Sequence, residues 1–320
     1  FKVMTKCLLT KLKGVADNAE LLHIGELRFN VKKNSSPTAG SQYIVFSVIK
    51  DTEINIIGDG YISNSTFSEN RGKNASLNAN VNSGLHFING DYKVAIMDKY
   101  SLKTLSMPNN GSFIANIDDL KYSKELSTLG GVFEGNISSI KELNRLTKIS
   151  ITGNNLAGDL SVVSGLVNTE SLSITGENLT GDLSAVSGLA NMTGCYLTMS
   201  NLKGNLNSLA NCAKLVDARF PACNITGDIA TLPKTMTYLE FRGKLSWSER
   251  PSTSNIIAFG GRIQIDNVDK MLQDQAACVA YTGETPWFKK INVIGARTSA
   301  SDAAVQKLQS KGYTVSITPA

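Results

Sequence analysis

The sequence predicts a mixed α/β protein in which an N-terminal antiparallel β-sandwich is followed by a solenoid of 23-residue coils and a helix-strand C-terminal cap. Three observations support this fold class. A glycine-centred motif recurs at a fixed interval, short alternating apolar runs precede it, and helical spacing follows it. We expect an extended arm over 1–35, the β-sandwich over 36–120, the solenoid over 121–265 and the cap over 266–320.

The repeated motif has an apolar residue two places before a glycine and another two places after it. It occurs at 133–137 (FEGNI), 156–160 (LAGDL), 179–183 (LTGDL), 202–206 (LKGNL) and 225–229 (ITGDI), each 23 residues after the last. Glycine adopts backbone conformations that a Cβ forbids, so we expect the coil to turn at each glycine. Leu160, Val163 and Leu166 follow at spacing three, which predicts a 3₁₀ or short helical return on the convex side.

Apolar residues ahead of each motif keep the same phase, for example Leu146, Ile149 and Ile151 ahead of Leu156. The L-x-L part alternates with period two, which is typical of a strand with one buried face. The whole pattern resembles leucine-rich repeats, and the Gly-Asp or Gly-Asn pairs resemble repeat proteins of gut Bacteroidetes and their phages. Such a resemblance implies a binding or structural protein rather than an enzyme.

Short apolar runs before residue 120 predict the strands of the sandwich. They lie at 43–49, 54–57, 85–88 and 92–96, and the polar stretch 64–84 is expected to be a long loop. The arm contains an apolar stretch, 21–29, that needs a partner.

The chain after residue 235 departs from the repeat. Met236, Leu239 and Phe241 predict a shortened coil, and 256–265 predicts a strand. Helical spacing over 268–279 and a strand over 291–295 follow. Ser301 is expected to cap a helix that runs to Lys311 with Val305 and Leu308 inward, and 313–317 predicts a terminal strand.

Composition argues against several functions. The net charge is +5 without a dense basic block, which disfavours nucleic-acid binding, and no apolar run is long enough to span a membrane. The five cysteines show no metal-ligand spacing and are expected to be small buried residues, and His23 and His86 are expected to be packed residues. No catalytic motif is present. We therefore predict a non-enzyme without cofactor or metal.

Asp159, Asp182 and Asp228 recur at one place per coil. They could form a row of calcium sites or serve as turn residues. Asn136 and Asn205 occupy the same place in other coils, which favours the turn interpretation.

The predicted binding site lies on the concave, strand-lined face. Outward positions are small in the early coils, at Ser150, Thr152, Ser171, Ser173 and Thr175, and become large and mixed later. The candidate ligand-binding residues are Tyr196, Asp217, Arg219, Tyr238, Glu240 and Arg242. Tyrosine and arginine are the residue types that anchor interfaces.

Two function classes follow from the resemblance. The first is a phage virion component, such as a head or tail fibre or decoration protein on the virion surface. The arm would contact virion neighbours, and the solenoid would contact a host protein or glycan. The alternative is a bacterial cell-surface adhesin or lipoprotein that binds protein or glycan. A third, an enzyme in the N-terminal domain, would need an intact catalytic pair there. A homo-oligomer is possible, and no signal peptide is recognised, although a leader ahead of Phe1 stays open.

Overall fold

The computed structural model describes the backbone of residues 113–320 and of eight strands ahead of them. These strands are β1 (Ala19–Ile24), β2 (Leu27–Val31), β3 (Tyr43–Val48), β4 (Thr52–Gly58), β5 (Tyr61–Ser65), β6 (Ser83–Phe87), β7 (Tyr92–Met97) and β8 (Leu102–Ser106). Side chains are described for 103–106 and 114–320. The chain forms two compact units, Phe1–Arg145 and Leu146–Ala320.

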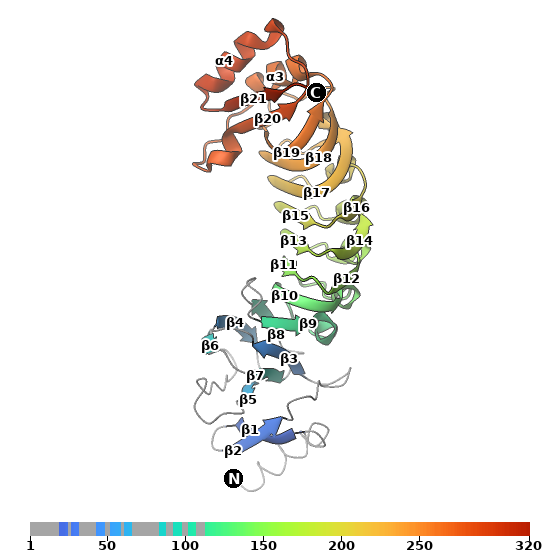
Figure 1. The fold of residues 1–320 in the computed structure, drawn as a ribbon, viewed down its shortest axis with the longest axis vertical. Coiled ribbons are helices and arrows are strands. Elements are labelled where there is room, and N and C mark those ends of the chain that lie inside the picture. Colours follow the sequence, from blue (N-terminus) through green and yellow to red (C-terminus); the bar gives the residue numbers. More distant parts are fainter. Residues whose placement is uncertain are drawn as a thin grey trace. The chain divides into compact units, whose positions relative to one another are not determined.

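The strands of the first unit pair mainly antiparallel (Figure 1). One group has the order β5-β7-β3-β9, with β9 at Phe113–Asn116, and the other has the order β6-β4-β8. The four strands predicted from apolar runs are therefore confirmed. The sandwich itself depends on side chains between the two groups, which lie outside the described residues, as do residues 66–82 of the predicted loop.

The segment predicted as an arm contains one antiparallel strand pair. In that pair β1 lies beside β2, with Leu21 opposite Phe29. Residues 1–18 and the side chains of Cys7, His23 and His86 lie outside the described residues, so their predicted roles stay predictions.

Coil geometry is already present at Asn116, ahead of the boundary that we placed at 121. Strand β10 (Thr128–Asn136) pairs in parallel with β8 and with β9, and 3₁₀ helices η2 (Ile117–Leu120) and η3 (Ile137–Ile140) follow β9 and β10. The Asn116 side chain accepts a hydrogen bond from the Asp118 amide (2.9 Å), as Asn136 does from Ser138 (2.9 Å). Ala115 occupies the place before the cap that Gly135 occupies one coil later. The glycine motif therefore does not identify this coil.

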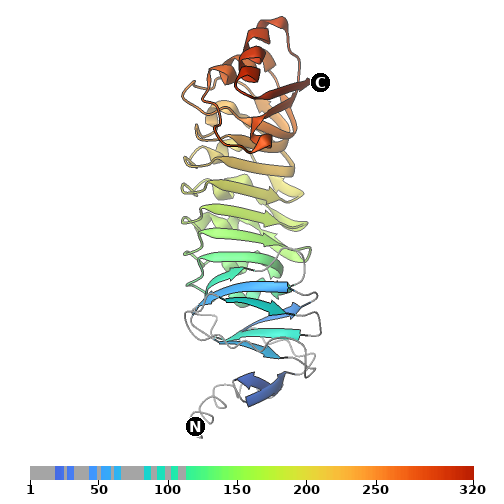
Figure 2. The same cartoon turned by 90° about the vertical axis from the view of Figure 1, so that its left-hand side faces the viewer.

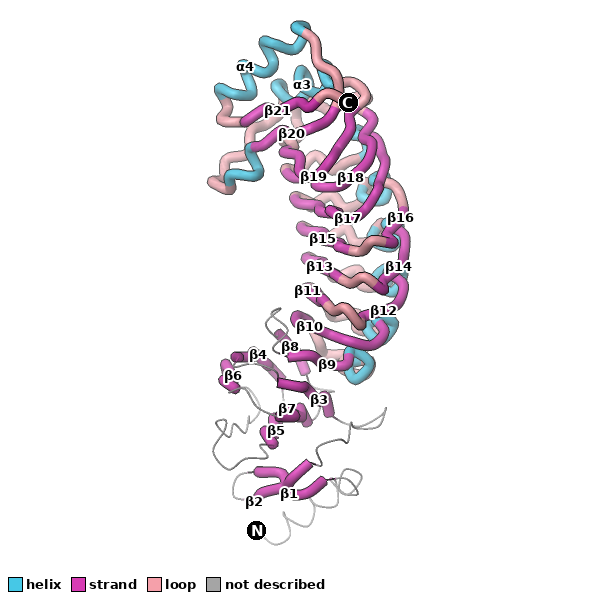
Figure 3. The backbone as a smooth tube through the Cα atoms, viewed as in Figure 1, coloured by secondary structure: helices cyan, strands magenta, loops and turns pink. Residues whose placement is uncertain are grey.

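The second unit is a stack of parallel strands (Figures 1 and 3). The ladder comprises β11 (Lys148–Thr152), β13 (Ser171–Thr175), β15 (Gly194–Thr198), β17 (Asp217–Asp228), β18 (Tyr238–Ser246), β19 (Ala258–Ile265), β20 (Lys290–Ile294) and β21 (Thr314–Thr318). Ile149 is in register with Leu172, which is in register with Cys195. These partners are 23 residues apart in sequence, so the predicted leucine-rich-repeat solenoid is confirmed.

Each early coil has a second short strand after the turn. Strands β12 (Leu156–Asp159), β14 (Asn178–Asp182) and β16 (Asn201–Lys203) pair in parallel as a second ladder. The 3₁₀ helices η4 (Leu160–Gly165), η5 (Leu183–Val186), η6 (Leu206–Leu209) and η7 (Ile229–Thr231) follow. Figure 3 shows these helices on the outer side of the stack, as predicted.

The motif glycines serve two purposes. At Gly181 the backbone is left-handed (φ +144°), and an added Cβ would lie 2.5 Å from the Cβ of Leu160 in the previous coil. At Gly227 the backbone is not left-handed, yet an added Cβ would lie 2.6 Å from the Leu206 Cβ. Close approach of neighbouring coils, rather than backbone conformation alone, therefore requires glycine at this place.

The core is built from rows of equivalent inward residues. Ile151, Ile174, Leu197, Phe220 and Phe241 are at most 1% exposed and follow one another along the ladder. Burying each such side chain contributes roughly 1.5–3 kcal/mol. Four of the five cysteines, at 195, 212, 223 and 278, are buried and unpaired, as predicted.

The C-terminal end adds two helices, α3 (Val268–Ala277) and α4 (Asp302–Ser310). Two 3₁₀ turns lie between them, η8 (Pro286–Lys289) directly before β20 and η9 (Ser299–Ser301) directly before α4. Ser301 is the N-cap residue of α4, as predicted, but its hydroxyl donates to Asp269 (2.6 Å) and does not cap the helix. The Thr298 side chain caps η9. Leu308 is buried as predicted, whereas Val305 is only half-buried.

Within the described residues, no helix is both long and apolar enough to cross a membrane.

Candidate functional site

The outward row on the concave face changes character along the second unit. Ser150, Ser173, Tyr196, Arg219 and Glu240 are successive partners in register across β11, β13, β15, β17 and β18. These strands lie on the inner side of the curved stack in Figure 1, and Figure 2 looks onto that side. The early part of the face is therefore a neutral surface of small hydroxyl side chains, and the later part carries rings and charges.

Arg219 is held between two tyrosines and one carboxylate. Its Nε and Nη2 donate to the two oxygens of Asp217, at 2.9 and 2.6 Å. Its guanidinium carbon lies 5.3 Å from the centre of the Tyr196 ring and 4.7 Å from that of Tyr238. The Tyr196 hydroxyl also donates to Asp217 (3.2 Å). Bidentate pairing and ring contacts on an arginine fix the orientation of its side chain.

Aromatic residues from a loop near the C-terminus extend this arrangement. Phe288, in η8, stacks on Tyr238 with ring centres 5.3 Å apart and an angle of 19° between the rings. Tyr281 meets Phe288 edge to face at 5.1 Å. The Tyr238 hydroxyl donates to Glu240 (3.3 Å). We call Tyr196, Arg219, Tyr238 and Phe288, together with Asp217, the tyrosine–arginine stack.

Two glycines make room for the tyrosine rings. An added Cβ at Gly194 would lie 3.0 Å from the Tyr196 ring, and one at Gly260 would lie 2.3 Å from the Tyr238 hydroxyl oxygen. Neither glycine has a left-handed backbone, so only the space above them requires the absence of a side chain. Each tyrosine ring thus occupies space that a side chain at the adjacent glycine would otherwise fill.

The side chains of the site are partly buried, and this burial shifts the pKa values of its tyrosines. The Asp217 side chain is 8% exposed and that of Arg219 is 32% exposed. Burial, with a smaller contribution from nearby carboxylates, raises the pKa of Tyr196 and of Tyr238 to about 12, so both phenols stay protonated at neutral pH. The hydrogen bonds to Asp217 raise the pKa of Arg219 further. The stack therefore offers oriented donors and ring edges, without a group poised for proton transfer.

Direct contacts link five of the six predicted site residues, and none is found between these five and Arg242. Tyr196, Asp217, Arg219, Tyr238 and Glu240 are linked by the contacts above. Arg242 is exposed and pairs in register with Asn224, after an irregularity in β17 between Phe220 and Asn224. It therefore lies past that irregularity, two residues after Glu240, and its predicted role in ligand binding stays a prediction.

Three aromatic residues of this region, Tyr281, Trp287 and Phe288, were missed from the sequence. They lie outside the repeat, so no periodicity connects them with Tyr238. The available signal was composition, because residues 281–288 hold three aromatic residues in an otherwise polar loop. Trp287 is 51% exposed and is one of four large apolar side chains found exposed in the described part of the chain.

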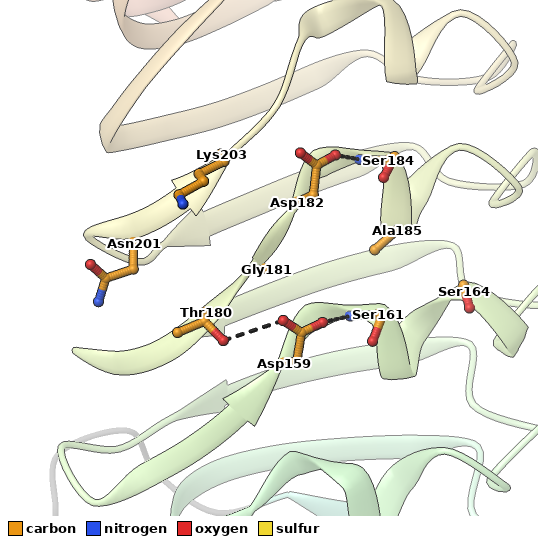
Figure 4. A pocket seen from close by; sticks show the side chains of 10 residues that line it. All are labelled: Asp159, Ser161, Ser164, Thr180, Gly181, Asp182, Ser184, Ala185, Asn201 and Lys203. Carbon is orange, nitrogen blue, oxygen red and sulfur yellow. Dashed lines mark hydrogen bonds between the residues drawn. The ribbon is translucent and has the colours of Figure 1, made fainter.

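The recurring aspartates cap the 3₁₀ helices (Figure 4). One oxygen each of Asp159, Asp182 and Asp228 accepts the amide two residues on, at 2.9, 2.8 and 2.8 Å, and Asn205 does the same at 2.8 Å. These bonds lower the pKa of Asp159 and Asp182. Turn chemistry accounts for the row, as the sequence favoured.

An open hollow of about 670 Å³ lies between two of these caps, lined by polar side chains such as Thr180, Asn201 and Lys203. Among the described residues, no three His, Cys, Asp or Glu side chains are grouped so as to hold a metal ion.

No protein-family model matches the chain, and no curated protein matches it. Among solved structures, the chain is similar to the leucine-rich-repeat ectodomain of the plant membrane receptor kinase GASSHO1/SCHENGEN3 from Arabidopsis thaliana, in complex with CASPARIAN STRIP INTEGRITY FACTOR 2. The identity is 16%, the TM-score is 0.41, and the match covers 63% of this chain and 25% of that one. It is also similar to an internalin, inlF, from Listeria monocytogenes, with 15% identity, a TM-score of 0.36, and coverage of 63% and 71%. The chain thus spans about a quarter of the plant ectodomain.

Proposed function

We propose that this protein is a non-enzymatic binding protein whose second unit holds a protein partner on its concave face, at the tyrosine–arginine stack and Trp287. The observation that carries the proposal is the orientation of Arg219 by Asp217 and two rings. A side chain that is already ordered loses little entropy on binding.

The chemistry of the stack suits a protein partner. Arg219 uses Nε and Nη2 on Asp217, which leaves Nη1 to donate to a partner carbonyl or carboxylate. The half-exposed Trp287 stands next in sequence to Phe288, which is itself part of the stack. Tryptophan, tyrosine and arginine dominate the energetic centres of protein interfaces.

The early coils act as a spacer in this proposal. Their concave positions are serine and threonine, in register at Ser150 with Ser173 and at Thr152 with Thr175. Small neutral side chains give little binding free energy but let a partner approach closely. The partner's main contacts therefore fall on the later coils.

The test uses peptides selected from a random display library on the wild-type protein. We expect Trp287→Ala and Tyr196→Ala to weaken most selected peptides by about tenfold, equivalent to about 1.4 kcal/mol. Val167→Ala is a matched control, because Val167 is also an apolar side chain that is 51% exposed but lies outside the stack. Peptides that are insensitive to Trp287→Ala, or equally sensitive to Val167→Ala, would contradict the proposal.

The finer assignment to a phage virion, with a bacterial surface adhesin or lipoprotein as the alternative, rests on the resemblance of the repeat alone. Quantitative mass spectrometry of purified particles separates the two. A fixed copy number per particle supports the virion component, and recovery from bacterial membranes with a lipid-modified N-terminus supports the lipoprotein.

A further inference from the structure

From β17 to β19, the outward residues beyond the turn change from neutral to basic. In β17 they include Asn224 and Thr226, which are in register with Arg242 and Lys244 in β18. Arg242 is in turn in register with Arg262 in β19. All three cations are exposed. We call Arg242, Lys244 and Arg262 the basic rim.

The basic rim is unfavourable for the folded chain by itself. Strands that pair in a sheet lie about 4.8 Å apart, so the Cα atoms of Arg242 and Arg262 are close. Like charges directly opposite one another on adjacent strands destabilise a sheet. Among the described side chains, neither arginine takes part in an ion pair that would offset this cost.

Three carboxylates of the same region accept hydrogen bonds from groups outside the basic rim. Glu240 accepts the Tyr238 hydroxyl, Asp228 accepts the Ala230 amide, and Asp266 accepts the Trp247 amide. The ion pairs found among the described side chains involve Arg145, Arg219, Lys270 and Arg297, and none involves the basic rim. Its positive charge is therefore available to an anion from outside.

The basic rim is continuous with the tyrosine–arginine stack. Arg242 follows Glu240 by two residues on β18, and Arg262 follows Gly260, the glycine beneath Tyr238, by two residues on β19. Two residues of strand span about 7 Å. One partner that covers the stack therefore also reaches the rim.

We propose that the basic rim binds a carboxylate-rich segment of the same protein partner, an inference that rests on the proposed function. The arginine fork matches a carboxylate with two parallel hydrogen bonds. Three cations over two strands do not form the extended basic stripe by which nucleic-acid-binding proteins contact phosphates. The rim raises the association rate of an acidic partner, whereas the stack slows its dissociation.

The probe is a fluorescein-labelled polyglutamate of about 20 residues, measured by anisotropy at low salt. We expect the wild-type protein to bind it with an affinity that falls as salt rises. The double variant Arg242→Gln, Arg262→Gln should lose about tenfold, while the double variant Lys124→Gln, Lys141→Gln, which removes the same charge from exposed positions elsewhere, should change affinity less than about twofold.

Unchanged binding by the Arg242, Arg262 variant would overturn the inference. So would preferential binding of heparin or duplex DNA through the same two arginines, with polyglutamate left unbound. Trp287→Ala should leave polyglutamate binding intact. The experiment therefore distinguishes an error in the function proposed for the stack from an error in the inference about the basic rim. Circular dichroism of each variant verifies that the fold is retained.

Discussion

The early coils, 146–175, and the later coils, 194–289, differ in which residues their shared ladder places side by side. In the early coils each residue lies beside its own equivalent, as Ser150 beside Ser173 and Ile151 beside Ile174. In the later coils unlike residues meet, as Tyr196 meets Arg219 and Glu240 follows Arg219. A strict repeat places like beside like, so a repeated charge would repel itself along the stack. Neutral small residues suit the regular part, and recognition needs the irregular part.

The contacts of the stack show what irregularity allows. Asp217 and Arg219 pair within one strand, two residues apart, and Phe288 reaches Tyr238 from a loop that no coil repeats. The basic rim is the exception, because Arg242 and Arg262 are like charges in register. That exception is the reason to expect a partner there.

The largest expected effect concerns the buried row of core residues that runs through both regions. Phe220→Ala should lower the free energy of unfolding by about 3–5 kcal/mol, because it deletes a fully buried ring. The early-coil counterpart Ile174→Val removes one methylene from the same row and should cost about 0.5–1.5 kcal/mol. Urea unfolding monitored by circular dichroism measures both. A smaller loss for Phe220→Ala than for Ile174→Val would show that the later coils lack a tight core.

A second prediction concerns the space beneath Tyr238. Gly260→Ala should cost about 1–3 kcal/mol, because the new methyl would lie 2.3 Å from the Tyr238 hydroxyl oxygen and force the ring to move. The near-ultraviolet circular dichroism of the tyrosines should change with it.

Tyr238→Phe supplies the matched test for Gly260→Ala. It removes the oxygen nearest to the new methyl, so the double variant should recover part of the loss. A double-mutant cycle with no coupling between the two positions would show that the ring does not lie over Gly260.

A third, smaller effect concerns the caps of the early coils. Asp159→Ala should cost about 1 kcal/mol, because the Ser161 amide loses its acceptor. Asp159→Asn should be nearly neutral, since Asn136 and Asn205 cap equivalent helices. Hydrogen bonding lowers the pKa of Asp159 in the folded state, so its contribution is present above the unfolded pKa of about 3.9 and is lost as pH falls through the lower folded value. Equal losses for both variants at pH 7 would argue against the capping role.

The regular part could be predicted from sequence because its repeat period determines which residues are neighbours on adjacent strands. The 23-residue spacing fixes the partner of Ile149 as Leu172 without any long-range knowledge. Five of the six site residues were also predictable, because outward positions follow from the alternation of the strand. Phe288 was not, since it meets Tyr238 through a loop whose path no period encodes. The register of Arg242 past the irregularity in β17 was not predictable either, because alternation alone does not show where a strand is interrupted.

The smallest expected effect returns to the early coils and to a glycine that the fold does not require. Gly165 ends η4, is exposed, has no left-handed backbone, and an added Cβ would have no atom within 4 Å. Gly165→Ala should therefore stabilise the protein by about 0.4–1 kcal/mol, because alanine restricts the unfolded chain more than glycine does. Gly194→Ala, placed 3.0 Å from the Tyr196 ring, should have the opposite sign. If thermal unfolding showed both substitutions to be destabilising, the glycines would serve chain flexibility in both regions, and the distinction between a regular spacer and a fitted recognition surface would fail.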